Sequence, residues 1–178
     1  MKKLFTLCFL MLPFFTHAQS GGKIGFQYDQ NPTVSANGKA LLNPWAGGLN
    51  SAQYSTIRLN NDNRDDLVVF DRSTGKVNTF VAIDNPTGSG IAWRYAPEYE
   101  TAFPINVYSW LLLVDYDGDG RKDVFAARSE GVQVLHNESQ NGKVVFKTAA
   151  NPLTTIGLSE LRIPIYVAGT DIPAITDF

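Results

Sequence analysis

The sequence has little cysteine, histidine or charge. It holds one cysteine and two histidines in 178 residues, and charged residues make up 18% of the chain. The cysteine, Cys8, lies inside an apolar run at the N-terminus. Because it is the only cysteine, the chain cannot form an internal disulfide. Scarce histidine and cysteine also argue against a zinc site, which takes its ligands from these residue types.

The N-terminal apolar run has the features of a secretory signal peptide. Lys2 and Lys3 precede an apolar stretch at 4–15, and Ala18 is a small residue before Gln19. This order of charged region, apolar region and small residue predicts a signal peptide over residues 1–18. A membrane anchor or a buried core helix is the alternative, but the run is shorter than the ~20 residues of a transmembrane helix and no second run follows. We therefore expect no transmembrane span.

Cleavage before Gln19 would change the charge of the chain. It would remove two lysines and no acidic residue, leaving 13 basic and 17 acidic residues and a formal net charge of −4. An acidic chain argues against nucleic acid as a partner. The exported chain would also lack cysteine, because Cys8 lies too early to be the lipidated residue of a lipoprotein and would be removed. Packing or bound metal would then have to stabilise the domain, which we expect to be secreted or at the cell surface.

Short β-rich runs bounded by turn residues recur along the chain, whereas helical periodicity is hard to find. The predicted class is all-β. The predicted strands are 54–59, 67–70, 77–83, 110–114, 124–127, 132–136 and 144–147.

The strands and the polar loops between them form a repeat. The segment 59–67 aligns with 116–124 at an offset of 57 residues, which takes Asp66 onto Asp123. A third copy begins at 173–178, where Asp177 aligns with Asp115 at an offset of 62 residues. Repeats of this length with about four strands each are typical of propeller blades rather than of a sandwich.

The repeat divides the chain into five segments. They are a signal peptide (1–18), a lead-in segment (19–53), a first blade (54–107), a second blade (108–163) and the start of a third, truncated blade (164–178). Closed propellers have about four to eight blades. We therefore expect a partial propeller that forms the N-terminal piece of a longer protein.

The second blade contains the most informative motif, an acidic loop at 115–123. It reads DxDxDGxxD, and such spacing brings alternate side chains to one point around a hard cation. The predicted ligands of this cation, Ca²⁺, are Asp115, Asp117, Asp119, the backbone carbonyl of Arg121, and Asp123. Four carboxylates this close repel one another without a cation. Mg²⁺ prefers fewer protein ligands, and a solvated acidic turn is the alternative without metal.

An EF-hand or dockerin loop begins in the same way. In an EF-hand, however, position twelve is a glutamate, and here it is Ala126. The flanking segments also read as strands. We therefore interpret the loop as a connection between two β-strands.

The first blade carries a degenerate version of this loop at 58–66. Arg58 and Asn63 stand where the second copy has Asp115 and Gly120, whereas Asn60, Asp62 and Asp66 remain. A guanidinium at position 58 could replace the cation by pairing with Asp62 and Asp66, so we expect this loop to be free of metal. Asp177 would be the first ligand of a third loop.

The two loops and their period resemble the FG-GAP/VCBS repeats of integrin-α-like propellers. The resemblance covers residues 54–178, and its most specific element is the loop at 115–123. The segments 45–50, 70–72 and 95–99 also look like large secreted proteins of the Bacteroidetes. In such relatives a C-terminal domain for type IX secretion is usual.

Other candidate sites are weaker. Trp45, Trp93 and Trp110 could stack on sugars, but aromatic residues in β-repeats more often pack in the core. His136 has no nucleophile motif nearby, and we expect it to be a surface residue at the end of a strand. No pair of carboxylates stands out as a glycosidase pair. The sequence therefore does not predict an enzyme.

Three functions follow as hypotheses. The first is a calcium-binding scaffold or adhesion module whose rim loops bind an extracellular protein or a glycan. The second is a non-catalytic accessory part of a larger secreted enzyme or polysaccharide-handling protein. The third is a mechanical spacer in which calcium serves only stability. Because propellers carry many unrelated activities, the fold alone does not choose between them.

Overall fold

The computed structural model describes residues 25, 29, 31–168 and 171–176. The predicted signal peptide and Asp177 lie outside these residues. The chain divides into two units at Pro32 and Thr33, and the features below belong to the second.

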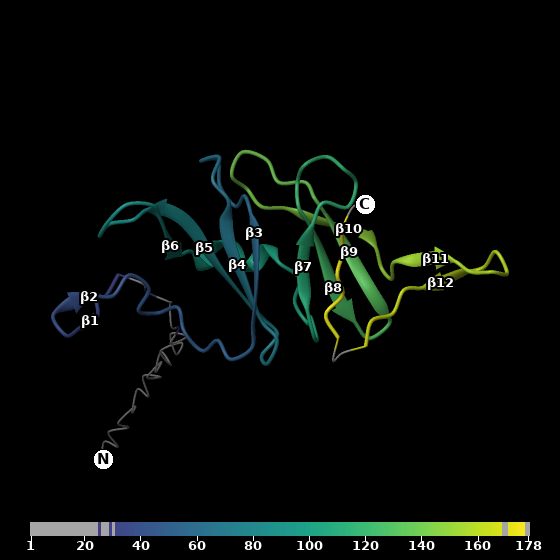
Figure 1. Ribbon diagram of the computed structural model, residues 1–178, viewed down its shortest axis with the longest axis horizontal. Helices are drawn as coiled ribbons and strands as arrows, with labels where there is room; N and C mark the ends of the chain where they lie inside the picture. The colour runs from purple at the N-terminus through teal and green to yellow at the C-terminus, as the bar shows by residue number, and fades with distance from the viewer. Residues whose placement is uncertain (1–24, 26–28, 30, 169–170, 177–178) are drawn as a thin grey trace, which may run out of the picture. The chain divides into compact units, whose positions relative to one another are not determined.

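The first large sheet is a meander of four antiparallel strands (Figure 1). Each strand pairs with the next in the chain, so their order in the sheet is their order in the sequence. The strands are β3 (Ala52–Ile57), β4 (Asp66–Asp71), β5 (Lys76–Asp84) and β6 (Ile91–Tyr95). Strands β4 and β5 are rich in valine, phenylalanine and other residues that favour a pleated, buried surface, and they form the middle of the sheet.

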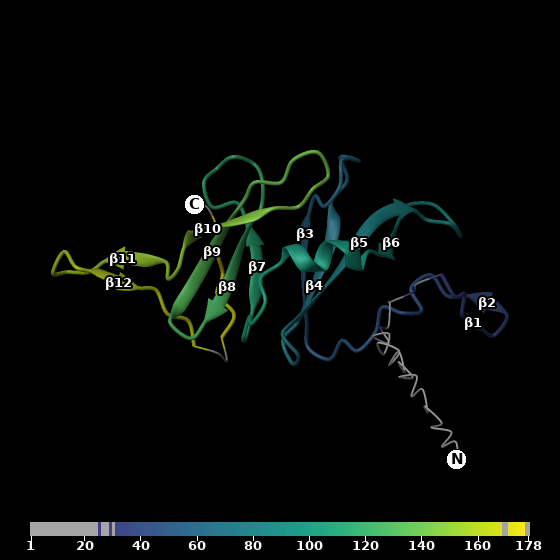
Figure 2. The same cartoon turned by 180° about the vertical axis from the view of Figure 1, so that it is seen from behind.

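The second large sheet repeats this arrangement, as the view from behind also shows (Figure 2). Its strands are β7 (Leu111–Val114), β8 (Asp123–Arg128), β9 (Gly131–Asn137) and β10 (Phe146–Ala150). Two hairpins, β1 (Ser35–Ala36) with β2 (Lys39–Ala40) and β11 (Thr154–Ile156) with β12 (Arg162–Pro164), form two further small sheets.

The all-β prediction is confirmed by these four antiparallel sheets. The described residues contain one short 3₁₀ helix, η1 (Pro97–Ala102), and no helix long and apolar enough to cross a bilayer. None of the sheets closes on itself. The fold is therefore established as β-sheet meanders, and the propeller stays a prediction.

Each of the seven predicted strands overlaps an observed strand. The fourth strand of the first sheet, β6, was missed because its short segment, IAWRY, follows a run of Gly, Ser, Pro and Thr that reads as loop. The fourth strand of the second sheet was placed at 144–147 but runs over Phe146–Ala150. Its middle residues are exposed, so it lacks the apolar alternation that would have fixed its bounds.

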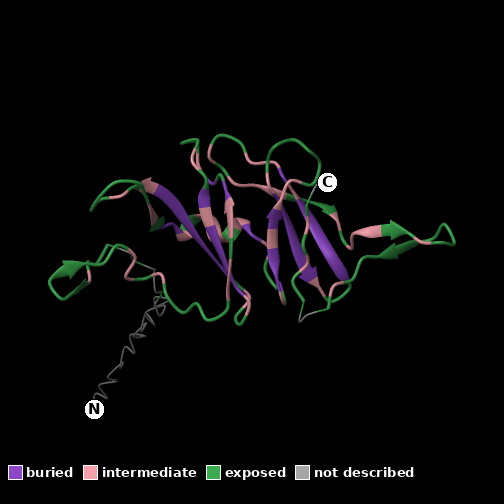
Figure 3. Cartoon of the chain, viewed as in Figure 1, coloured by how far each residue is buried: buried purple, intermediate pink, exposed green. Residues whose placement is uncertain are grey.

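The main hydrophobic core lies between the two large sheets. Ile57, Val68 and Phe70 of the first sheet share one buried cluster with Leu111 and Val124 of the second. The two middle strands of each sheet are almost continuously buried (Figure 3). Such continuous burial requires cover on both faces of a sheet.

The outer faces of the two sheets are covered by neighbouring segments of the chain. On the first sheet, Val69, Phe80 and Tyr95 pack with Ala46 from the segment before β3. On the second sheet, the fully buried Trp110 belongs to a cluster that Val167 and Ile175 cover from the segment after β12. Each sheet is thus packed on both faces. The prediction that the tryptophans pack in the core is confirmed for Trp110 and holds in part for Trp93, which is partly buried, but Trp45 is 42% exposed.

Two glycines make the same close backbone contact in the two large sheets. Gly75 follows β4 and Gly131 begins β9, and both have positive φ, at 68° and 132°. A Cβ added to Gly75 would lie 2.8 Å from the carbonyl oxygen of Val107, and one added to Gly131 would lie 2.8 Å from that of Ile165. In both sheets, therefore, the connection that follows the fourth strand passes closely over the turn between the second and third strands.

We expect Gly75→Ala and Gly131→Ala each to lower the free energy of unfolding by more than Gly38→Ala. All three residues have positive φ, so each alanine costs about 1–2 kcal/mol of backbone strain. Only the first two would also collide with a backbone oxygen, which adds about 1–3 kcal/mol, whereas nothing lies within 4 Å of the Cβ position of Gly38. Urea unfolding of the three variants measures the difference. Equal midpoints would contradict the close approach.

Candidate metal centre

The acidic loop joins β7 to β8 and is held by its own carboxylates. The two oxygens of Asp115 accept hydrogen bonds from the backbone N–H groups of Gly118 and Gly120, each at 2.8 Å. Gly118 and Gly120 have φ values of 79° and 83°, a left-handed conformation that glycine adopts without steric cost. The motif thus folds its backbone around the first aspartate.

Asp123 fixes the base of the loop. Its side chain is fully buried, and its two oxygens accept hydrogen bonds from the backbone N–H groups of Tyr116, at 2.7 Å, and Asn137, at 2.6 Å. Tyr116 lies at the start of the loop and Asn137 ends β9. The carboxylate therefore ties the loop to two neighbouring segments of the second sheet.

Three of the four predicted carboxylate ligands converge. Asp115, Asp117 and Asp123 each offer an oxygen, and these oxygens lie within 4.8 Å of one another. Carboxylate oxygen is the donor that a hard cation such as Ca²⁺ prefers. Each oxygen has two lone pairs, so those that accept an N–H can still donate to a metal. The donor set fits a hard divalent cation.

Asp119 is placed differently from the other three. It groups with Asp117 and with the imidazole of His136, and its Oδ2 accepts a hydrogen bond from the guanidinium of Arg121 at 2.9 Å. The backbone N–H of Arg121 and then its side chain hold the pKa of the Asp119 carboxyl below its usual value. Metal binding through Asp119 and through the carbonyl of Arg121 stays a prediction.

His136 is a site residue that the sequence did not indicate. It lies on β9, and the pairing of Val124 with Leu135 brings it beside the acidic loop. Its buried Nε2 is 2.8 Å from Oδ2 of Asp117, without hydrogen-bond geometry, and 3.6 Å from Oδ2 of Asp119. The side chain is 27% exposed, so the expected surface residue instead packs against the loop. The one signal in the sequence was the position of His136 near the end of a predicted strand, the part of a strand that lies closest to a loop.

The first loop is held at its base by a buried aspartate, as the second loop is. Asp66 is fully buried, and its oxygens accept hydrogen bonds from the backbone N–H groups of Leu59 and Ala82, both at 2.8 Å. Burial raises the pKa of the Asp66 carboxyl, and these hydrogen bonds oppose the rise. Asp66 and Asp123 thus make the same pair of contacts in the two sheets.

The outer part of the first loop has lost the convergence of acids. Asn60 and Asp62 bond to each other, and Asp62 also accepts the N–H of Arg64 at 2.9 Å. In the described part of the chain, groups of three metal-ligating side chains form only around the second loop. That the first loop is free of metal stays a prediction.

The expected partner of Arg58 was wrong. We predicted that its guanidinium would pair with Asp62 and Asp66, but it lies 3.8 Å from Oδ1 of Asp65, with 64% of the side chain exposed. Asp66 is fully buried, whereas the side chains of Arg58 and Asp65 are both largely exposed. Arg58 therefore extends to solvent and does not occupy the position of a cation.

Comparison of the chain with protein-family models, with curated proteins and with solved structures found no match in any of the three.

We expect Asp66→Ala to lower the free energy of unfolding by about 2–5 kcal/mol, because it leaves two buried N–H groups without an acceptor. The matched control is Asp65→Ala. Its side chain is 58% exposed and its ion pair is long, so the loss should stay below about 1 kcal/mol. Urea unfolding midpoints measure both changes. Similar midpoints for the two variants would show that the buried carboxylate does not hold the loop.

Proposed function

We propose that this chain is a calcium-binding β-repeat module, secreted or at the cell surface, whose two large sheets are blades of a β-propeller of the FG-GAP/VCBS type. The observation that carries the proposal is the convergence of oxygens from Asp115, Asp117 and Asp123 within 4.8 Å on the loop between two strands. The spacing of the motif and the position of the loop both favour a hard cation.

The way the sheets follow one another supports the blade interpretation. Both are four-stranded antiparallel meanders, and the first strand of the second sheet, β7, packs against the face of the first sheet. Ile175, in the segment that aligns with β7, lies against the face of the second sheet in the same manner. Repeated four-stranded antiparallel sheets are the units from which propellers are built.

Calcium would neutralise the carboxylates and stiffen the loop. Asp115, Asp117 and Asp123 would hold it, with Asp119 and the Arg121 carbonyl as the further predicted ligands. Of these, Asp115 and Asp123 are already oriented by backbone N–H groups, which reduces the conformational freedom lost on binding. The loop would then be a rigid part of one edge of the sheet. This supports a scaffold or adhesion role rather than catalysis.

We expect the purified protein to bind one Ca²⁺ through the second loop. Calorimetric titration should give one site per chain, which Asp117→Ala/Asp119→Ala removes. These side chains are respectively 41% and 28% exposed, so their loss should leave the fold intact. At a calcium concentration 100 times the Kd, binding stabilises the folded chain by about 2.7 kcal/mol, which a thermal melt with and without chelator would detect.

The matched control is Asn60→Ala/Asp62→Ala in the first loop, which should leave the calcium heat unchanged. If folded wild-type protein gave neither heat nor a thermal shift, the acidic loop would be only a turn. If the control variant lost the site and the second-loop variant kept it, the two loops would have been assigned in the wrong order.

A further inference from the structure

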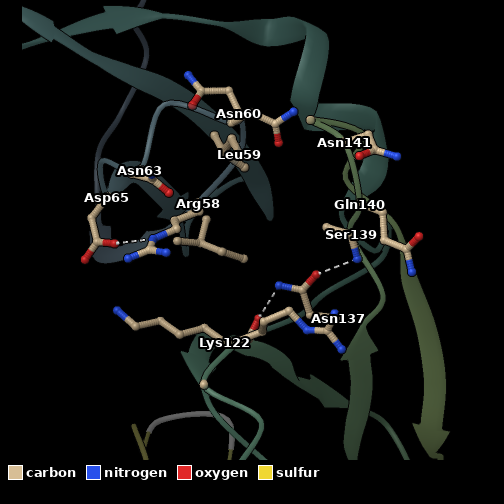
Figure 4. A pocket seen from close by; sticks show the side chains of 15 residues that line it. Arg58, Leu59, Asn60, Asn63, Asp65, Lys122, Asn137, Ser139, Gln140 and Asn141 are labelled. Atoms are coloured by element: carbon tan, nitrogen blue, oxygen red, sulfur yellow. Dashed lines mark hydrogen bonds and ion pairs between the residues drawn. The ribbon is translucent and has the colours of Figure 1, made fainter.

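A polar groove lies where the loops of the two large sheets meet (Figure 4). It is formed by the first loop at 58–65, the end of the acidic loop at 120–122 and the β9–β10 connection at 137–142. Its volume is about 670 Å³, within the range of roughly 300–1,000 Å³ that is common for small-ligand sites. The groove is distinct from the converging carboxylates, none of which lines it.

The groove presents side-chain amides with unused hydrogen-bonding capacity. Asn61, Asn63, Gln140 and Asn141 line it, and their side chains make no hydrogen bond in the part of the chain that the structure describes. Asn63 and Asn141 have φ values of 60° and 53°, so the backbone turns sharply at both positions. Each amide can donate two hydrogen bonds and accept two. The groove is therefore suited to a ligand with many hydroxyl groups.

Cations outnumber anions in the lining. Arg58, Arg121 and Lys122 line the groove together with one carboxylate, Asp65. The Lys122 ammonium donates to the hydroxyl of Thr56 at 2.7 Å and has no carboxylate partner among the described residues. Arg58 is 3.8 Å from Asp65, a weak exposed pair. Arg121 is paired with Asp119, which lies outside the lining, so the excess positive charge of the groove is small and comes mainly from Lys122. The whole chain has a formal net charge of −2.

The lining argues against other ligand classes. None of the residues that line the groove is aromatic, and its only large apolar members, Ile57 and Leu59, are buried. A protein partner would need an apolar or aromatic anchor point, and a single-stranded nucleic acid would need aromatic side chains for stacking. A small apolar ligand would need an apolar wall.

We infer that this groove binds an acidic oligosaccharide, with the amides pairing sugar hydroxyls and with Arg58 and Lys122 pairing the carboxylates of uronic acid units. Arginine and lysine form charge-assisted hydrogen bonds with carboxylates, and arginine can do so through two parallel bonds. The inference deepens the proposed function, on whose extracellular location it rests, by naming the ligand class. It does not require that calcium be bound.

The test is a titration of the purified protein with tetragalacturonate and with its fully methyl-esterified form, which keeps the hydroxyl groups but lacks the charges. Both titrations are run with chelator present, since galacturonate itself can bind calcium. The acidic tetramer should bind at least about tenfold more tightly than the ester, and the difference should shrink as salt is added. Equal affinities, or no binding of either, would overturn the inference.

Two variants with the same loss of charge locate the site. Arg58→Gln/Lys122→Gln should weaken binding of the acidic tetramer by about tenfold or more, whereas Lys76→Gln/Arg94→Gln, at positions that do not line the groove, should leave it unchanged. Equal weakening by both variants would indicate general charge attraction and would contradict a built site. The calcium titration of the same proteins is a separate readout, so failure of the groove and failure of the metal site are distinguishable.

Discussion

The buried carboxylate at the first residue of the second strand is the contact on which each large sheet depends. Asp66 and Asp123 are both fully buried, and each binds one backbone N–H from its own loop and one from the third strand. A buried charge is costly unless hydrogen bonds satisfy it. Here each carboxylate has two such bonds, so the long loop between the first two strands is closed at its base.

This closure shapes the core. With the loop base fixed, Leu59 and its neighbour Ile57 stay in the cluster between the two sheets, where they meet Phe70 and Leu111. The same base holds the acidic residues of the second loop at the edge of the sheet, where Asp115 and Asp117 approach Asp123. Packing of the sheets and arrangement of the candidate metal ligands therefore have one common origin.

Features encoded by short-range pattern could be predicted from the sequence. Short β-rich runs bounded by turn residues predicted the middle strands, and the spacing of Asp115, Asp117 and Asp123 predicted the convergence of their oxygens, because both depend on local backbone geometry. The 57-residue offset between Asp66 and Asp123 likewise predicted two sheets of the same design.

Features that depend on contacts between distant residues could not be predicted. His136 reaches the acidic loop only through the pairing of β8 with β9, and Arg58 lies beside the exposed Asp65 because Asp66 is fully buried. The groove needs loops from both sheets. Asn61 and Asn141 come together there although 80 residues separate them in the chain. No local pattern in the sequence predicts a contact between segments so far apart.

The two loops differ most at their outer residues and least at their base, and this has a consequence for how such repeats diverge. Because Asp66 keeps its backbone contacts without any of the residues that the metal motif requires at 58 and 63, substitutions in the outer part of a loop leave the framework unchanged. The outer residues of such a loop can therefore differ between repeats, in charge and in donor groups, while the strands that the loop joins keep the same pairing.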